Sequence, residues 1–265
     1  MIVRGGAGAP FAARLAEAGG AVVLVEPDPH DAVRLRDGFA RAGLGVEVAA
    51  TAPSGRSVGF DGTGEVDARV PWRGGPSLHL AGAVLETTAD VPEATALARR
   101  LGVAHVVTRA GPVSWRLTRA LRGEVDRLLL DGAMVAEVDE ALEAAGMAEG
   151  PLVAEDRAGV ALPAGADWPV TARLVVEGKL GRALGAGWYR YPGGGGAVED
   201  PIVDDLILEE ARFAGVARRE VEADEIVARA RAALHAEVAE VVAEGIASEA
   251  DARRVQALAL GLPPG

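Results

Sequence analysis

The chain contains no cysteine and few aromatic residues, and each absence excludes something. Without cysteine there are no disulfides, thiolate zinc sites, iron–sulfur clusters or cysteine nucleophiles. Aromatic residues make up 4% of the chain, so a core must be packed mainly from Ala, Val and Leu. No uncharged apolar stretch has the length that spans a bilayer, and no secretory signal is recognised. We therefore expect a cytoplasmic protein without membrane insertion.

The chain is strongly acidic, with a net charge of −12 at pH 7. An acidic surface repels polyanions, which argues against nucleic acid as a partner. A polyanionic ligand would need a local basic patch or backbone amides to hold it. The 265 residues, 49% hydrophobic and 25% charged, are typical of a globular protein of one or two domains.

Residues 1–108 alternate between short apolar runs and amphipathic segments, which predicts an α/β domain. Helices are predicted at 9–19, 31–43 and 92–102, and strands at 21–26, 46–50, 78–88 and 103–109. The run A-V-V-L-V-E-P favours a buried parallel strand because it is continuously apolar and ends at an acid and a proline. Residues 52–76, rich in Gly, Pro, Ser and Asp, are predicted to form a loop.

Two helical stretches follow, at 113–145 and 224–260, and the glycine-rich segment P-G-G-G-G at 192–196 is interpreted as a linker between them. The stretches share features in the same order. Three residues recur 113 positions later: Arg116 as Arg229, Glu124 as Glu237, and Gly132 as Gly245. Asp139 corresponds to Asp251, and the segment from Gly146 to the one from Gly261. Chance matches in Ala-rich helices are the alternative, but the order favours an internal duplication.

A glycine-rich loop near the start resembles a nucleotide-binding loop. Gly5, Gly6 and Gly8 precede a predicted helix, and Glu26 closes the next strand, 18 residues after Gly8. Glycines let the backbone approach a pyrophosphate at a helix amino terminus, and an acid at that strand end binds the ribose hydroxyls of NAD. The strict G-x-G-x-x-G pattern is absent. If Gly8 is the last glycine of the loop, little or no first strand remains before it.

Three segments carry a resemblance to a known family. G-K-L-G-R-A-L-G-A-G-W-Y-R-Y at 178–191 is similar to the G-x-x-G-x-x-x-G-x-G-F-Y-x-Y segment of 3-hydroxyacyl-CoA dehydrogenases. E-G-P-L-V-A-E-D-R-A-G-V at 149–160 is similar to G-P-F-x-L-x-D-x-x-G. A-E-V-A-E-V-V-A-E-G-I-A-S-E-A-D at 236–251 resembles the family's helix pair. Two helical units in one chain also resemble the dehydrogenase part of multifunctional fatty-acid oxidation α-subunits, in which the second unit packs on the first like a partner subunit.

The resemblance implies NAD-linked oxidation of the 3-hydroxyl of an acyl-CoA, with a His as base and a Glu that orients it. L-H-L-A-G and V-L-E match the family's His and Glu segments, so His79 corresponds to the base and Glu86 to its partner. The chain departs from the family pattern in three ways. The Phe-Phe-Asn-Pro after the His is missing, the N-T-S segment has no match, and Trp115 stands where the family has a substrate-binding Asn.

The remaining polar residues favour structural roles. His105 is predicted on a strand, and His30 and His235 on helix surfaces, with no metal-ligand spacing among them. Carboxylates at 139, 156 and 251 are interpreted as helix caps or turn residues, and the aromatic residues at 188, 189 and 191 as packing residues. An arginine-rich face includes Arg109, Arg116, Arg119 and Arg122. This face could bind the phosphates of CoA, or it could be a solvated helix face.

The sequence thus predicts an α/β plus all-α protein. A shortened Rossmann-like NAD-binding domain covers 1–108, and two helical units of dehydrogenase C-terminal type cover 109–192 and 193–265. The expected activity is 3-hydroxyacyl-CoA dehydrogenation with NAD in β-oxidation-type metabolism. Expected partners are an acyl-CoA substrate and either a second copy, as a homodimer, or a β-oxidation partner enzyme. Two alternatives stay open: a catalytically degraded paralogue that binds acyl-CoA or a partner enzyme without hydride transfer, and a piece of a longer dehydrogenase.

Overall fold

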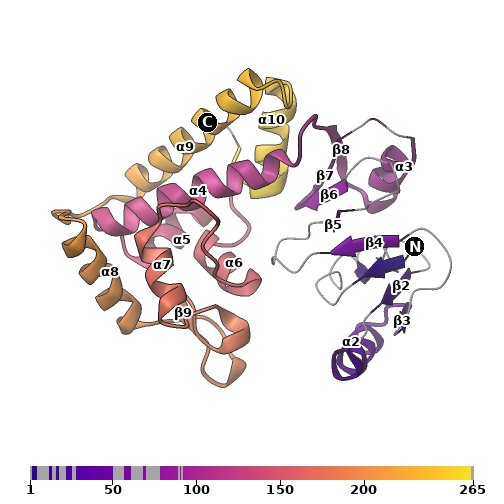
Figure 1. Ribbon diagram of the computed structural model, residues 1–265, viewed down its shortest axis with the longest axis horizontal. Coiled ribbons are helices and arrows are strands. Elements are labelled where there is room, and N and C mark those ends of the chain that lie inside the picture. Colours follow the sequence, from indigo (N-terminus) through magenta and orange to yellow (C-terminus); the bar gives the residue numbers. More distant parts are fainter. Residues whose placement is uncertain are drawn as a thin grey trace. The chain divides into compact units, whose positions relative to one another are not determined.

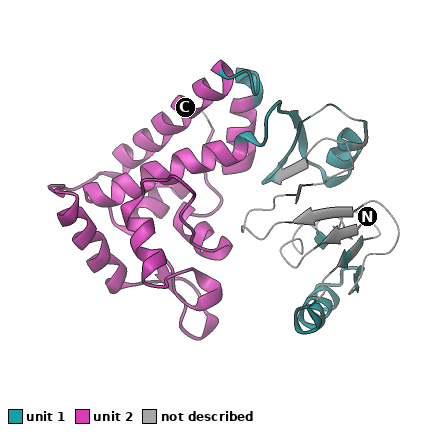
Figure 2. Cartoon of the chain, in the orientation of Figure 1, with its two compact units in different colours: residues 1–113, 244–251 teal, residues 114–243, 252–265 magenta. Residues whose placement is uncertain are grey.

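The structure, a computed structural model, is described here for residues 2–4, 12–13, 16–17, 22–25, 28–49, 57–60, 68–69, 78–88, 90 and 92–263 (Figure 1). It divides into two compact units (Figure 2). The first comprises residues 1–113 with 244–251, and the second comprises residues 114–243 with 252–265. Among the helices in these ranges, none combines the length and apolar character needed to cross a membrane.

A five-stranded sheet lies at the start of the first unit, in the order β3-β2-β1-β4-β5. The strands are β1 (Ile2–Arg4), β2 (Val22–Val25), β3 (Val46–Ala49), β4 (Ser57–Phe60) and β5 (Ala68–Arg69). The first four run parallel, and β5 is antiparallel to β4. With β1 between β2 and β4, the order 3-2-1-4 is that of a doubly wound α/β sheet.

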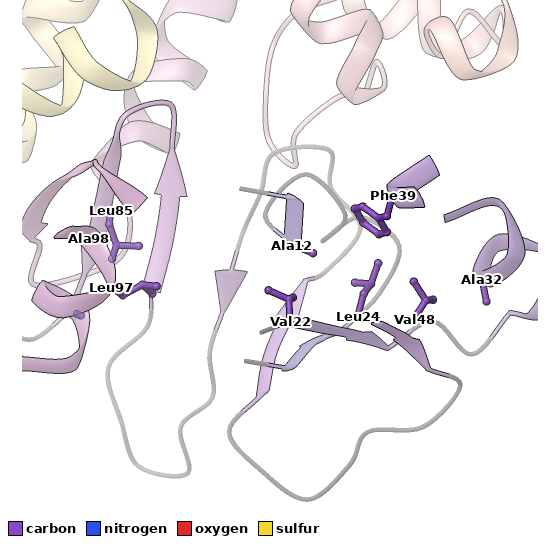
Figure 3. Packing of buried hydrophobic residues seen from close by; sticks show 10 residues of the cluster. Ala12, Val22, Leu24, Ala32, Phe39, Val48, Leu85, Leu97 and Ala98 are labelled. Atoms are coloured by element: carbon purple, nitrogen blue, oxygen red, sulfur yellow. The ribbon is translucent and has the colours of Figure 1, made fainter. Parts of the chain in front are cut away.

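Helix α2 (Pro29–Arg41) connects β2 to β3, and residues 12–13 and 16–17 are helical between β1 and β2. The carboxylate of Asp28 caps α2 by accepting from the backbone N–H groups of His30 and Asp31, each at 2.9 Å. Apolar side chains from the sheet and these helices are buried together, as Figure 3 shows: Ala12, Val22, Leu24, Ala32, Phe39 and Val48. The continuous apolar run in β2 therefore marks a buried strand, as predicted.

One expectation about this sheet was met in part and another was wrong. The first strand is short, as the interpretation of Gly8 as the last glycine implies, but it is present, because the three residues of β1 pair with both β2 and β4. The region 52–76 is not all loop, since it contains β4 and β5. Both strands are too short to show a periodic pattern in a segment rich in Gly and Ser, and β4 is defined by its pairing with β1 rather than by its own sequence.

A separate three-stranded sheet completes the α/β part of this unit, in the order β6-β7-β8. Strands β6 (Leu78–Ala81) and β7 (Val84–Thr87) are antiparallel, and β8 (Ala104–Val107) runs parallel to β7 after α3 (Pro92–Leu101). The stretch 78–88 is thus a hairpin and not the single strand expected. Gly82 has φ of +51°, a left-handed conformation that glycine adopts easily and that permits the tight turn. Leu85, Leu97 and Ala98 pack together between β7 and α3 (Figure 3).

The second unit is mostly helical. Its elements are α4 (Val113–Asp131, from Ser114 onward), α5 (Val135–Ala144), α6 (Pro151–Ala158), α7 (Pro169–Val176), the short helix η2 (Arg182–Leu184), β9 (Tyr189–Arg190), η3 (Pro192–Gly194), β10 (Val198–Glu199), α8 (Pro201–Phe213), α9 (Ala223–Ala243), the end of α10 (Glu249–Val255) and a π-helical turn, η4 (Gln256–Leu260). The helical pattern predicted for 113–145 and 224–260 is therefore confirmed in type. The glycine-rich segment 192–196 joins β9 to β10, which pair antiparallel, so it turns a small hairpin.

The repeated residues make reciprocal contacts between α4 and α9. Arg116 forms an ion pair with Glu237, and the equivalent pair is Arg229 with Glu124, whose Nε and Oε1 atoms are 2.6 Å apart. A similar exchange relates Gly146 and Gly261. A Cβ atom built on Gly146 would lie 2.9 Å from the carbonyl oxygen of Gly261, and one on Gly261 would lie 3.1 Å from that of Gly146. Contacts in which a residue of the first repeat meets the second, and its equivalent in the second meets the first, are those of a two-fold arrangement.

Candidate functional site

The β6–β7 hairpin brings together the two residues that the sequence proposes as an acid–base pair. In its register the Cα of His79 lies opposite that of Glu86, between the pairs Leu78–Thr87 and Leu80–Leu85. Residues directly opposite in an antiparallel pair have Cβ atoms about 4.5–5.5 Å apart on one face of the sheet. The backbone thus pairs His79 with Glu86, although seven positions separate them in the sequence. The side chain of His79 is outside the described part of the chain.

Glu86 lies at the amino terminus of α4. Its side chain is buried, with 1% of the residue exposed, and Oε2 accepts from the backbone N–H of Val113 at 2.6 Å. The first N–H groups of a helix have no partner within the helix, and the positive end of the helix dipole favours an anion there. A carboxylate has two oxygens, so one can bind this N–H while the other accepts from an imidazole. Glu86 therefore accepts the first N–H of α4, and its role as the partner of His79 stays a prediction.

His105 is on β8, as predicted, and it faces away from Glu86. Its register partner on β7 is Leu85, and since side chains alternate along a strand, it shares a face with Leu85 and Thr87. There Nε2 is 2.8 Å from Oγ1 of Thr87, and Nδ1 is 3.2 Å from Oγ1 of Thr95. Burial lowers the pKa of this imidazole. Both ring nitrogens have hydroxyl partners, so His105 is a structural histidine.

The sequence also predicts His30 and His235 as helix-surface residues, and Trp115 at the position of a substrate-binding Asn. His30 is exposed near the start of α2, and His235 is exposed on α9, so both helix-surface predictions are confirmed. Trp115 lies in the first turn of α4, two residues after Val113, and is half-buried. Its correspondence to the substrate-binding Asn stays a prediction.

The proposed cofactor residues Gly5, Gly6, Gly8 and Glu26 lie outside the described residues. The elements next to them are described. Gly5 follows the last residue of β1, and Glu26 follows the last residue of β2. Because β1 and β2 are adjacent and parallel, their carboxyl ends at Arg4 and Val25 lie at the same edge of the sheet. Ligands of open α/β sheets bind at the carboxyl ends of the strands.

The glycine/aromatic segment of the second unit is organised by a buried aspartate. Asp156 accepts from the backbone N–H groups of Trp188 and Tyr189, at 2.8 and 2.9 Å, and from the hydroxyl of Tyr191 at 2.9 Å. A Cβ on Gly187 would lie 1.9 Å from Oδ1 of this carboxylate. The glycine is thus required by close approach. Burial raises the pKa of Asp156, while these hydrogen bonds act in the opposite direction.

A second buried aspartate connects the same segment to α6. Asp139 accepts from the backbone N–H groups of Leu152 and Val153, at 2.8 and 3.1 Å, and from the hydroxyl of Tyr189 at 2.8 Å. Burial raises its pKa to about 6. The structural roles predicted for Asp139 and for the aromatic residues are confirmed. The bonds from the tyrosine hydroxyls to these carboxylates have no local sequence signal, because the bonded residues are 50 and 35 positions apart.

Known structures share this fold. The dehydrogenase part of multifunctional enzyme 1 from C. elegans has a TM-score of 0.65 and 14% sequence identity, and the match covers 99% of this chain and 78% of that one. The 3-hydroxybutyryl-CoA dehydrogenase from Escherichia coli K12 has a TM-score of 0.61 and 16% identity, covering 100% of this chain and 89% of that one. No protein-family model matches the chain.

One curated relative was also found by sequence. It is the peroxisomal bifunctional enzyme of Cavia porcellus, 28% identical over 205 residues, which are 65% of this chain. The chain spans only 27% of that enzyme's length.

The fold is therefore mixed α/β and mostly helical, and it is the fold of 3-hydroxyacyl-CoA dehydrogenases. The resemblance inferred from the sequence, to these enzymes and to the dehydrogenase part of multifunctional oxidation enzymes, is confirmed.

Proposed function

We propose that the protein is a member of the 3-hydroxyacyl-CoA dehydrogenase family that interconverts a 3-hydroxyacyl-CoA and a 3-oxoacyl-CoA with NAD. The observation that carries this proposal is the register of the β6–β7 hairpin, in which His79 lies opposite Glu86. Two residues matched to separate family segments are paired across strands on a fold shared with those dehydrogenases. The likeness to multifunctional enzymes supports a setting in fatty-acid β-oxidation.

In the proposed reaction His79 removes the proton of the 3-hydroxyl group as the C3–H bond breaks. NAD, when bound, supplies the acceptor for the hydride from C3, so the alcohol is oxidised to the ketone. A base must be neutral before it accepts the proton and must be stabilised as a cation afterwards. The carboxylate of Glu86, itself held by Val113, is the group that orients the imidazole and stabilises the imidazolium.

The first sheet fits the cofactor that this reaction needs. Its order, with β1 between β2 and β4, is the doubly wound order that binds dinucleotides at the strand ends. In the sequence, Gly5, Gly6 and Gly8 follow β1 and Glu26 follows β2, so we assign the glycines to the pyrophosphate and Glu26 to the ribose hydroxyls of NAD. We infer from this that residues 1–108 form a short Rossmann-like domain.

The reciprocal ion pairs support the proposal that residues 109–192 and 193–265 are duplicated helical units. Arg116 with Glu237 and Arg229 with Glu124 are the pairs that a two-fold dimer of a single unit would make. On this interpretation the chain contains within itself the interface that two copies would form. Whether a second copy or another β-oxidation enzyme also associates with it, and whether it is cytoplasmic, stay predictions; the curated relative is named as peroxisomal.

The test is NADH formation with a panel of 3-hydroxyacyl-CoA substrates from short to long chain. We expect the wild type to turn over at least one, and His79→Ala to lose most of kcat, by about 100-fold or more as for loss of a general base. His30→Ala is the matched control, since it removes an exposed imidazole on α2. Glu86→Gln, which keeps an oxygen for Val113, should lower kcat less than His79→Ala does.

Folded wild-type protein that reduces no NAD with any substrate would overturn the dehydrogenase proposal. Equilibrium binding of an acyl-CoA, measured on the same sample, would then identify the alternative, a paralogue that binds acyl-CoA without hydride transfer. Equal activity of His79→Ala and His30→Ala would instead refute the role of His79 as the base.

A further inference from the structure

A cavity of about 320 Å³ lies along α4 in the second unit. From this helix it is lined by Arg116, Arg119, Ala120, Gly123 and Arg127. Positions 116, 120, 123 and 127 are spaced by four, three and four residues, so they form one stripe along the helix. The two small residues lie between arginines at either end of this stripe.

Trp168, just before α7, provides another wall of the cavity. Its indole lies against Gly123, because a Cβ on that glycine would be only 2.8 Å from Nε1. The guanidinium of Arg122 lies 4.9 Å from the indole centroid and that of Arg119 lies 5.8 Å from it. Within the described ranges, Nε1–H of Trp168 donates no hydrogen bond. It is therefore a donor available at the cavity.

The arginines differ in their partners. Arg122 is paired with Glu155, Arg116 with Glu237, and Arg127 with Glu124 at 2.7 Å. Arg119 has no carboxylate partner in the part of the chain that is described, and there its hydrogen bond is to the carbonyl oxygen of Ala164, at 3.5 Å. That distance is at the limit of a hydrogen bond.

The lining therefore has an excess of positive charge. Three of its side chains are guanidinium groups, and Glu237 is the one carboxylate among the described lining residues. Glu237 is already bound to Arg116, so the spare charge belongs mainly to Arg119. A positive cavity is notable in a chain with a net charge of −12. It is the local basic patch that an anionic ligand requires on an acidic protein.

We propose that this cavity binds a small phosphate-bearing anion. Guanidinium groups present paired N–H donors that match the oxygens of phosphate, and the indole N–H adds one directed donor. The two polar side-chain groups that remain available at the cavity, the guanidinium of Arg119 and Nε1–H of Trp168, are both donors. They suit a ligand whose polar atoms all accept hydrogen bonds. The volume is at the lower end of that of small-molecule sites, so a compact diphosphate or a phosphate ester fits better than a long acyl chain. The proposal does not depend on dehydrogenase activity.

Calorimetric titration of the full chain with inorganic pyrophosphate at low ionic strength tests the proposal. We expect saturable binding that Arg119→Gln weakens by about tenfold or more, the effect of losing hydrogen bonds to a charged group. Arg212→Gln is the matched control, because Arg212 is also exposed and has no ion pair among the described residues, yet lies on α8 outside the cavity lining. It should change the affinity less than twofold. Ala120→Glu, which places a carboxylate in the stripe, should abolish binding.

A second titration with adenosine 3′,5′-bisphosphate separates the two sources of such a phosphate. Tighter binding than pyrophosphate supports a site for a nucleotide-borne phosphate, and equal or weaker binding supports a site for a free one. The proposal is overturned if wild type binds neither compound, or if Arg119→Gln and Arg212→Gln lower the affinity equally. The latter result would mean that pyrophosphate meets only the general charge of the surface, and that this arginine face is simply solvated.

Discussion

Arg116 of α4 and Glu237 of α9 form an ion pair, and the residues that correspond to them in the repeat, Arg229 and Glu124, form the same pair in the opposite direction. All four side chains are half-buried, with exposed fractions between 12% and 29%. The bonded residues are 121 and 105 positions apart, on either side of the 113-residue spacing of the repeat, and they meet across the two long helices. The residues that recur along the sequence are therefore the ones that form the reciprocal ion pairs.

These ion pairs should stabilise the helical unit by similar mechanisms. We expect Arg116→Gln to lower the free energy of unfolding by about 1–2 kcal/mol, since the pair is largely shielded from solvent. Arg229→Gln should lower it more, because Arg229 also binds Asp131 at 2.6 Å. Urea unfolding followed by tryptophan fluorescence measures both. Arg157→Gln is the control: its pair with Glu149 is exposed, and its loss should cost less than about 0.5 kcal/mol. Equal effects of Arg116→Gln and Arg157→Gln would contradict the prediction.

Gly187 should tolerate no side chain. Alanine there would force aside the carboxylate of Asp156 and disrupt its bonds to Trp188 and Tyr189. We expect a loss of about 2–4 kcal/mol, as for a buried hydrogen-bond network that is broken. Gly196→Ala, where nothing lies within 4 Å of the added atom, should change stability by less than about 0.5 kcal/mol. If the thermal melts of the two variants coincide, the carboxylate of Asp156 can move away from an added Cβ at position 187, and the prediction is wrong.

The raised pKa of Asp139 predicts a dependence of stability on pH. Its pKa is about 6 in the folded protein against an ordinary value of 3.8, so the folded state holds the proton more tightly. The contribution of this proton to the free energy of unfolding is full below about pH 4 and amounts to up to about 3 kcal/mol. It is lost as the pH rises to about 6. Unfolding free energies of wild type and Asp139→Asn, measured from pH 4 to 7, should therefore converge or cross as pH rises. A constant difference over this range would refute the raised pKa.

The imidazole of His105 should titrate below its ordinary pKa of 6.5, because burial disfavours the cation. Asp90 acts in the opposite direction, so Asp90→Asn should lower the pKa further. Proton NMR of the histidine ring signals, with His105→Gln for assignment, measures both values. A pKa at or above 6.5 in wild type, or an increase in Asp90→Asn, would show that the ring is solvated.

Elements with long or continuous patterns could be predicted from sequence. The 19 residues of α4 and the 21 of α9 carry enough helical turns for their periodicity to be clear. Strand β2 is marked by its unbroken apolar run, and β8 by V-A-H-V-V. Short pieces were missed. The strands β4 and β5 have four and two residues, and β9 and β10 have two each, so their pairing partners define them.

The candidate site was predictable only as far as single residues. His79 and Glu86 were found by motif, but a single strand was expected where Gly82 makes a turn, so the cross-strand register followed from the structure alone. The bond from Val113 to Glu86 joins residues 27 positions apart and has no sequence signal. The same holds for the arginine-rich face, because ion pairs with Glu155 and Glu237 decide which of its charges stay uncompensated.

The ion pairs of α4 and α9 also bear on how the association of these helices depends on protein concentration and on how their sequences can change. Both partners are on one polypeptide, so dilution cannot separate them as it separates two subunits, and their encounter does not depend on protein concentration. A substitution at Arg116 alters one contact and leaves the contact of Arg229 intact, whereas in two identical chains it would alter both. If the two helical units are duplicates, as proposed, each is able to change in sequence while the ion pair of the other is retained.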